Sequence, residues 1–239
     1  MEIRKENNNE KFIQVYEGNK NNCLDENLNK NTKYEIRICS FYNNITSNWT
    51  NIQKVQTSNF ESIILKESQR ENEFLNKIME WSGYKDIELI YRGTRDGMQS
   101  NVFHNKCDNQ GPTICLFKNE KNYIFGAYTS LSWTSNGGYK SASDSFIFTL
   151  TNIHGTEPTK FNNTNSSYSV SHNSGGPTFG NGHDIYISSD SNNNNSSYSN
   201  FPSAYQDSLG KGKSIFTGDL NNSNIYFKMK EIEVFKLFK

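Results

Sequence analysis

The feature that most limits the possible folds of this chain is the grouping of its apolar residues into short runs of strand length. Residues 113–117, 123–128 and 145–150 are such runs, and polar turns bound each of them, as is typical of buried strands. Helical spacing occurs at 69–82, before a glycine stop at Gly83, and again at 98–107. Many strands with two early helices favour a mainly β (α+β) fold, an antiparallel two-sheet sandwich, over a parallel doubly wound sheet.

The C-terminal stretch has two alternating patterns in opposite phase. Apolar residues alternate from Ile225 to Met229, and they alternate again from Ile232 to Val234. A slip of one residue near 230–231 predicts a β-bulge, which keeps both halves facing the core. Further strands are predicted at 62–65, 87–91 and 184–188.

Composition limits the class of protein. Mean hydropathy is −0.82 and only 33% of residues are hydrophobic, but 16 Phe and 13 Tyr can supply a core. Lys+Arg and Asp+Glu are both 25, so no overall field attracts nucleic acid or an acidic membrane surface. No run approaches the roughly 20 apolar residues of a membrane helix, and the opening residues lack a secretory core. We therefore expect a cytoplasmic chain with no membrane insertion and no nucleic-acid partner.

Residues 1–57 are predicted to form short strands of their own. The run 33–42 alternates as a half-buried strand should, and Leu28, Thr32 and Tyr34 have the spacing of a tyrosine corner. This segment resembles the C-terminal half of a fibronectin type III domain. Because such a sandwich has roughly 100 residues, we expect a partial domain at 1–57, favour truncation of a longer protein, and expect a second domain at 58–239.

The cysteines are Cys23, Cys39, Cys107 and Cys115. In a chain expected in the reducing cytosol, buried thiols are the default and disulfides are not expected. His104 and Cys107 form an H-x-x-C pair without the second close pair that structural zinc needs, so we expect no metal and no cofactor. The same spacing places both side chains on one helix face, where a lowered thiol pKa would make Cys107 a redox thiol.

The glycine-rich loop 175–184 is the most unusual local sequence. It could form a nest of backbone amides for an anion, with His183 and Asp184 as an acid/base pair. The favoured interpretation is a tight turn, in which Gly176, Gly180 and Gly182 adopt conformations that other residues avoid. The G-K-G-K-S run at 210–214 lacks the first glycine of a phosphate loop and is predicted to be a solvated turn.

Arg92, Arg95 and Asp96 cluster where the predicted strand 87–91 ends, just before Gly97. Arginine is scarce in this chain, so a specific clamp is favoured over a weak surface ion pair. Asp96 is predicted to cap the following helix. No catalytic residue is assigned, and no G-x-S-x-G elbow occurs.

Taken in order, several segments from about 61 to 238 resemble the TLDc domain family. The matching segments are LIYRGTRDGM, GPTICLF, YIFGAYTSLSW, SFIFTL, GPTFGNGHDIYI and KEIEVF. The resemblance implies a two-sheet β-sandwich with accompanying helices, no agreed catalytic residues, and a role in oxidative-stress resistance. Some members bind the peripheral stalk of the vacuolar proton pump (V-ATPase) and modulate its assembly. The family-signature positions are Arg92, Arg95, Asp96, Gly97, Gly126, Trp133, Gly176, Gly180, Gly182, His183 and Asp184.

The chain departs from better-known members in two Asn/Ser-rich insertions, 161–174 and 189–200. The favoured hypothesis is a non-catalytic protein-interaction domain, with pump subunits as the candidate partner. One alternative is a thiol-based antioxidant enzyme that uses Cys107. Another is a recruitment module of a larger signalling or degradation protein.

Overall fold

The computed structural model describes residues 1–6, 11–14, 28, 32–42, 45–56 and 60–239. These residues divide into two compact units, Met1–Phe60 and Glu61–Lys239. None of the described helices is long and apolar enough to cross a lipid bilayer.

The first unit contains an antiparallel sheet in the order β2-β1-β3-β6 and a separate hairpin of β4 and β5. Its strands are β1 (Glu2–Lys5), β2 (Ile13–Gln14), β3 (Lys33–Arg37), β4 (Phe41–Tyr42), β5 (Ile45–Thr46) and β6 (Gln53–Gln56). Tyr34 of β3 is buried. The backbone just upstream of it, where a tyrosine corner would find its acceptor, lies outside the described residues, as does Cys23.

The second unit is built from two six-stranded sheets in which every pairing is antiparallel. The long-strand sheet has the order β12-β11-β9-β8-β18-β7 and the short-strand sheet the order β10-β13-β14-β15-β16-β17. The long strands are β7 (Asp86–Arg92), β8 (Thr113–Asn119), β9 (Ile124–Thr129), β11 (Phe146–Thr151), β12 (Thr159–Asn162) and β18 (Met229–Phe238). The short strands are β10 (Tyr139–Lys140), β13 (Val170–Ser171), β14 (Thr178–Phe179), β15 (Ile185–Tyr186), β16 (Ser197–Tyr198) and β17 (Tyr226–Phe227). The mainly β sandwich is therefore confirmed.

The helices of this unit are short except for one. They are α1 (Ile63–Glu67), α2 (Glu71–Ser82), α3 (Gly93–Asp96), α4 (Ser100–Cys107), α5 (Ser214–Thr217) and the 3-10 turn η1 (Ser166–Tyr168). The predicted helix before Gly83 is confirmed as α2, and Gly83 ends it with a φ of 71°.

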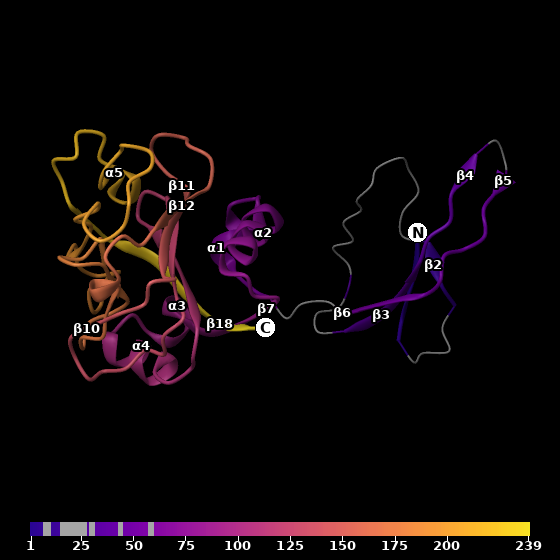
Figure 1. Cartoon of the computed structure of the whole chain (residues 1–239), viewed down its shortest axis with the longest axis horizontal. Coiled ribbons are helices and arrows are strands. Elements are labelled where there is room, and N and C mark those ends of the chain that lie inside the picture. The colour runs from indigo at the N-terminus through magenta and orange to yellow at the C-terminus, as the bar shows by residue number, and fades with distance from the viewer. Residues whose placement is uncertain (7–10, 15–27, 29–31, 43–44, 57–59) are drawn as a thin grey trace. The chain divides into compact units, whose positions relative to one another are not determined.

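The aromatic core lies between the two sheets, and a second apolar layer lies on the outer face of the long-strand sheet. Phe125 and Ile147 of the long-strand sheet pack in one cluster with Phe179 and Phe227 of the short-strand sheet. On the opposite face, Trp81 of α2 packs on rings of β11. Figure 1 shows α1 and α2 on one side of the sheet that contains β18, with α4, α5 and β10 on the other. Coverage on both faces explains why β8 and β9 are buried at every residue.

The segment 62–65 is a helix start, and the strand prediction there is wrong. Ser62 is the N-cap of α1, and its hydroxyl accepts a hydrogen bond from the Leu65 backbone N–H at 3.0 Å. A four-residue apolar run does not define a period, so the pattern alone could not distinguish a strand from a buried helix.

The β-bulge near 230–231 is confirmed. Met229 pairs with Asn119 of β8, whereas Glu231 pairs with Lys118, so one residue of β18 has no counterpart. Because of this slip, Met229 and Ile232 both reach the core despite their opposite phases in the sequence.

The two Asn/Ser-rich segments, 161–174 and 189–200, each contribute a strand to the short-strand sheet, and the first also contains the end of β12. The first contributes β13 and the second β16. Within the first, the Asn163 side-chain amide donates to the carbonyl of Ala142 at 3.1 Å and to the Ser169 hydroxyl at 2.5 Å. Asparagine in these segments therefore satisfies backbone and hydroxyl groups that short strands leave unpaired.

Candidate functional site

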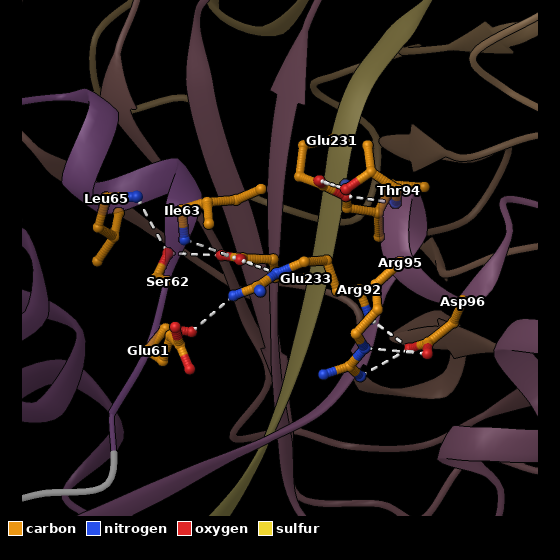
Figure 2. Close-up of polar contacts among 11 residues, drawn as sticks. Glu61, Ser62, Ile63, Leu65, Arg92, Thr94, Arg95, Asp96, Glu231 and Glu233 are labelled. Carbon is orange, nitrogen blue, oxygen red and sulfur yellow. Dashed lines mark hydrogen bonds and ion pairs between the residues drawn. The ribbon is translucent and has the colours of Figure 1, made fainter. Parts of the chain in front are cut away.

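A buried carboxylate lies beneath the start of α1. Glu233 of β18 is fully buried and accepts hydrogen bonds from the Ser62 hydroxyl at 2.5 Å, the Ile63 backbone N–H at 3.0 Å and Arg92 Nε at 2.8 Å. Figure 2 shows these donors converging on Glu233 from α1 and from the end of β7. Burial raises the pKa of Glu233, and the three donors act in the opposite direction.

A second buried glutamate lies two residues earlier on the same strand. Glu231 accepts from the Thr94 backbone N–H at 3.1 Å and also from the Thr94 hydroxyl. A Cβ on Gly93 would lie 2.9 Å from the Met98 side chain and 3.2 Å from Glu231 Oε1. Glycine at this position therefore lets the α3 turn approach the carboxylate closely.

The two signature arginines have different partners. Arg92 lies against Glu233, whereas Arg95 forms an ion pair with Asp96 at 2.7 Å. Arg95 also lowers the pKa of Asp96, with a further contribution from the Arg92 backbone N–H. The Asp96 side chain accepts from that N–H at 3.0 Å, and Gln99 is the N-cap of α4. The prediction that Asp96 caps the following helix is therefore wrong: it closes the α3 turn instead.

Cys107 does not have the surroundings of a reactive thiol. It is fully buried, and burial raises its pKa, which is the opposite of the lowered pKa that a redox thiol would need. The His104 ring bonds instead to Asp108 at 2.8 Å through Nδ1 and to the Gly175 carbonyl at 2.8 Å through Nε2. Cys115 packs in the same apolar cluster, and its pKa is also raised by burial. Within the described part of the chain, no three His, Cys, Asp or Glu side chains group as metal ligands.

In the glycine-rich loop, His183 and Asp184 have separate partners. Asp184 is fully buried and accepts from the backbone N–H groups of Ser203 at 2.6 Å and Ala204 at 2.8 Å. Burial raises the pKa of Asp184 to about 6. His183 is half-buried, and its Nδ1 bonds to the Tyr198 hydroxyl.

The signature glycines of this loop serve the backbone. Gly180 has a φ of 84°, and a Cβ there would overlap the Asp184 carboxylate. Gly182 has a φ of 66°, whereas a Cβ on Gly176 would lie 2.6 Å from the Ile187 carbonyl oxygen. Positive φ accounts for two of the glycines and close packing for the third.

The remaining signature positions lie in the core or in turns. Trp133 is buried, and its indole N–H donates to the Thr113 hydroxyl at 2.9 Å. A Cβ on Gly126 of β9 would lie 2.5 Å from the Phe148 ring and closer still to the Cys115 carbonyl oxygen. Gly97 has a φ of 112° at the end of α3.

The loop 210–214 has its own internal acceptors. Asp207 accepts from the Gly212 N–H at 2.7 Å, and Asn222 accepts from the Ser214 N–H at 2.8 Å. These amides are already paired within the chain and are not presented to a phosphate.

Sequence reasoning missed Ser62, Glu231 and Glu233. The two glutamates alternate with Ile232 and Val234, which is the pattern of a strand with one face in solvent. No local signal shows that α1 and α3 cover that face. Only the tertiary structure, in which α1 and α3 pack on that face of β18, shows that both carboxylates are buried.

The fold and these contacts define a mainly β sandwich domain in which the polar signature residues form hydrogen bonds and ion pairs with other side chains and with the backbone of the domain. The chain belongs to the TLDc domain family, because residues 58–238 match the model of the TLDc domain. A comparison with curated protein sequences finds no match.

Proposed function

We propose that residues 58–239 form a non-catalytic protein-interaction domain of the TLDc type that acts in the cytosol. The observation that carries this proposal is how Arg92, Arg95, Asp96 and Glu233 are bonded. Each bonds to another of these residues or to nearby backbone. A catalytic acid, base or nucleophile needs a group that faces the substrate, and these side chains already have internal partners.

The partner proposed for this domain is the peripheral stalk of the vacuolar proton pump, with a role in oxidative-stress protection. Membership of the TLDc family supports this, since some members bind that stalk. The strands β13 and β16 come from the Asn/Ser-rich segments 161–174 and 189–200, in which the chain is expected to depart from better-known members of the family.

For residues 1–57 we propose a partial fibronectin type III-like sandwich. The antiparallel sheet around β3 and the buried Tyr34 support it. So do several exposed apolar side chains, which half a sandwich would leave uncovered. They are Ile13, Ile38, Ile45, Trp49, Ile52 and Val55.

The test of pump binding uses the full chain and purified peripheral-stalk subunits, with complex formation measured by light scattering after size exclusion. A complex of defined stoichiometry supports the proposal. No complex, with the chain shown folded by circular dichroism, contradicts it. Cys107→Ser should bind as the parent does, since the proposal gives the thiol no role.

A further inference from the structure

The sequence contains two Asn-Gly pairs, Asn136-Gly137 and Asn181-Gly182. In such a pair the backbone nitrogen of the glycine can attack the side-chain carbonyl carbon of the asparagine and close a succinimide ring, because glycine has no side chain to hinder the approach. Both asparagines are exposed, and within the described part of the chain neither side-chain amide has a hydrogen-bond partner. The asparagine side chains therefore do not distinguish the two pairs.

The backbone nitrogen of Gly137 is held in a strand pairing. Its N–H donates to the His172 carbonyl at 2.7 Å, and the His172 N–H donates to the Gly138 carbonyl at 2.9 Å. These two bonds continue the antiparallel pairing of β10 with β13, in which Tyr139 lies opposite Ser171. Attack by the Gly137 nitrogen would break a backbone hydrogen bond of the sheet, which opposes ring closure at Asn136.

The backbone nitrogen of Gly182 is not held in this way. Among the described residues, its N–H bonds only to the Tyr139 hydroxyl, at 3.4 Å, which is longer than the usual range of about 2.7 to 3.2 Å. Gly182 is exposed, so water reaches this N–H. The Ser203 hydroxyl donates to the Asn181 carbonyl of the same peptide unit, which polarises that unit and makes its N–H more acidic. The attacking nitrogen is therefore available beside Asn181.

We propose that Asn181 is a site of spontaneous deamidation in the folded chain, whereas Asn136 is protected by the sheet. Hydroxide from water removes the Gly182 amide proton, the nitrogen forms a bond to Asn181 Cγ, and the Cγ–Nδ2 bond breaks. The leaving group takes up a proton from water and departs as ammonia. Water then opens the succinimide at either carbonyl and leaves aspartate or isoaspartate at position 181. The inference goes beyond the proposed role in protein binding and does not depend on it.

Deamidation at this position changes both the charge and the backbone of the glycine-rich loop. The formal net charge of the chain falls from 0 to −1, because a neutral amide becomes a carboxylate. Isoaspartate also inserts a methylene group into the main chain between Gly180 and His183, whose φ values are 84° and 68°. This turn leads directly into Asp184, which is buried and bonded to the Ser203 and Ala204 amides. The modification therefore alters the turn that positions a buried carboxylate.

The test incubates the full chain in mildly alkaline buffer at physiological temperature and follows both asparagines over time by peptide mass spectrometry with fragmentation. Asn181 should deamidate about fivefold faster than Asn136 or more, which corresponds to the net value of one backbone hydrogen bond. Equal rates, faster conversion at Asn136, or no conversion at Asn181 overturns the proposal. The product at 181 should include isoaspartate; aspartate alone would indicate direct hydrolysis of the amide and would overturn the succinimide route.

The unfolded chain is the matched control, because both sites have the same Asn-Gly chemistry once the fold is removed. In concentrated guanidinium chloride the hydrogen bond from Gly137 to His172 is lost, so the rates at Asn136 and Asn181 should become similar. If the preference for Asn181 is the same in the unfolded chain as in the folded chain, the neighbouring sequence sets it and the structural argument is wrong.

Two variants locate the reaction. Asn181→Gln should largely remove the species that gains one negative charge, measured by isoelectric focusing of the incubated chain, because a glutamine side chain closes its ring far more slowly. Asn136→Gln makes the same substitution at the other exposed Asn-Gly pair and should form the acidic species as fast as the parent does. An unchanged rate in Asn181→Gln, or a loss of the acidic species in Asn136→Gln, overturns the assignment to Asn181.

Discussion

The hydroxyl of Ser62 donates a 2.5 Å hydrogen bond to Glu233, which lies 171 residues later in the chain. The same hydroxyl accepts from the Leu65 backbone N–H and so caps α1. One side chain therefore starts the first helix of the domain and satisfies a carboxylate buried in its last strand. This hydrogen bond joins the two ends of the TLDc domain.

Ser62→Ala should lower the free energy of unfolding by about 2 to 3 kcal/mol, because it removes both a helix cap and a donor to a buried carboxylate. Chemical denaturation of the full chain measures this change. The control is Ser82→Ala at the end of α2, where the hydroxyl makes one 3.3 Å hydrogen bond to the Met79 carbonyl, and little change is expected. A loss no larger than that of the control would show that the Ser62 hydroxyl does not hold the two segments together.

Arg92→Met should lower the free energy of unfolding more than Ser62→Ala does, because it leaves the Glu233 carboxylate buried without a cation. Removing one partner of a buried pair costs about 3 to 5 kcal/mol. Arg95→Met is the matched control: the Arg95 side chain is 47% exposed and should contribute under about 1 kcal/mol. The double variant Arg92→Met/Glu233→Gln should lose less stability than the sum of the losses in Arg92→Met and in Glu233→Gln. Additive losses would contradict a direct interaction.

Gly126→Ala and Gly111→Ala are the same substitution, but we expect them to lower the stability of the folded chain by different amounts. At Gly126 the added methyl group would meet Phe148 and the backbone of β8, which we expect to cost about 3 kcal/mol or prevent folding. At Gly111 nothing lies within 4 Å, and only the φ of 86° opposes alanine, at about 1 kcal/mol. Thermal unfolding distinguishes them, and equal melting temperatures would contradict the close strand approach.

Cys107 and Cys115 should resist alkylation in the folded chain, because both thiols are buried and their pKa values are raised. Cys39 is partly exposed and should react before either of them. Timed iodoacetamide labelling followed by peptide mass spectrometry gives the order. Peroxide consumption should be the same for Cys107→Ser and the parent. Faster consumption by the parent would revive the antioxidant-enzyme hypothesis.

Asp184 should impose a pH dependence on stability. Burial raises its pKa to about 6 from an ordinary 3.8. Between these values the folded chain holds a proton that the unfolded chain has released, so the free energy of unfolding falls as pH rises. The expected fall is about 2 to 3 kcal/mol, at roughly 1.4 kcal/mol per pKa unit.

Denaturant unfolding at a series of pH values measures this slope, which Asp184→Asn should flatten. The control is Asp190→Asn. In the parent, the Asp190 carboxylate accepts a hydrogen bond from the Asn193 side chain at an exposed position, so this variant should keep the slope of the parent. Any contribution from Glu233 remains in all three proteins and cancels in the comparison. Identical slopes in parent and Asp184→Asn would contradict the raised pKa.

The sequence by itself determined the class of fold, because local patterns reflect local geometry. Alternation and run length predicted β8, β9 and β11, and the phase change before Ile232 predicted the bulge in β18. Helical spacing and Gly83 predicted α2 and its end. The ordered set of segments also indicated the TLDc family, which the match over 58–238 shows.

Only the tertiary structure decided which polar residues are buried and what they bond to. Glu233 follows the alternation of a solvent-facing position, and it is buried because α1, far away in the sequence, covers that face. The pairing of β16 with β15 on one side and with β17 on the other likewise joins separate segments of the chain, and no local pattern encodes it. Burial and pairing between distant segments are properties of packing, so periodicity along the chain cannot specify them.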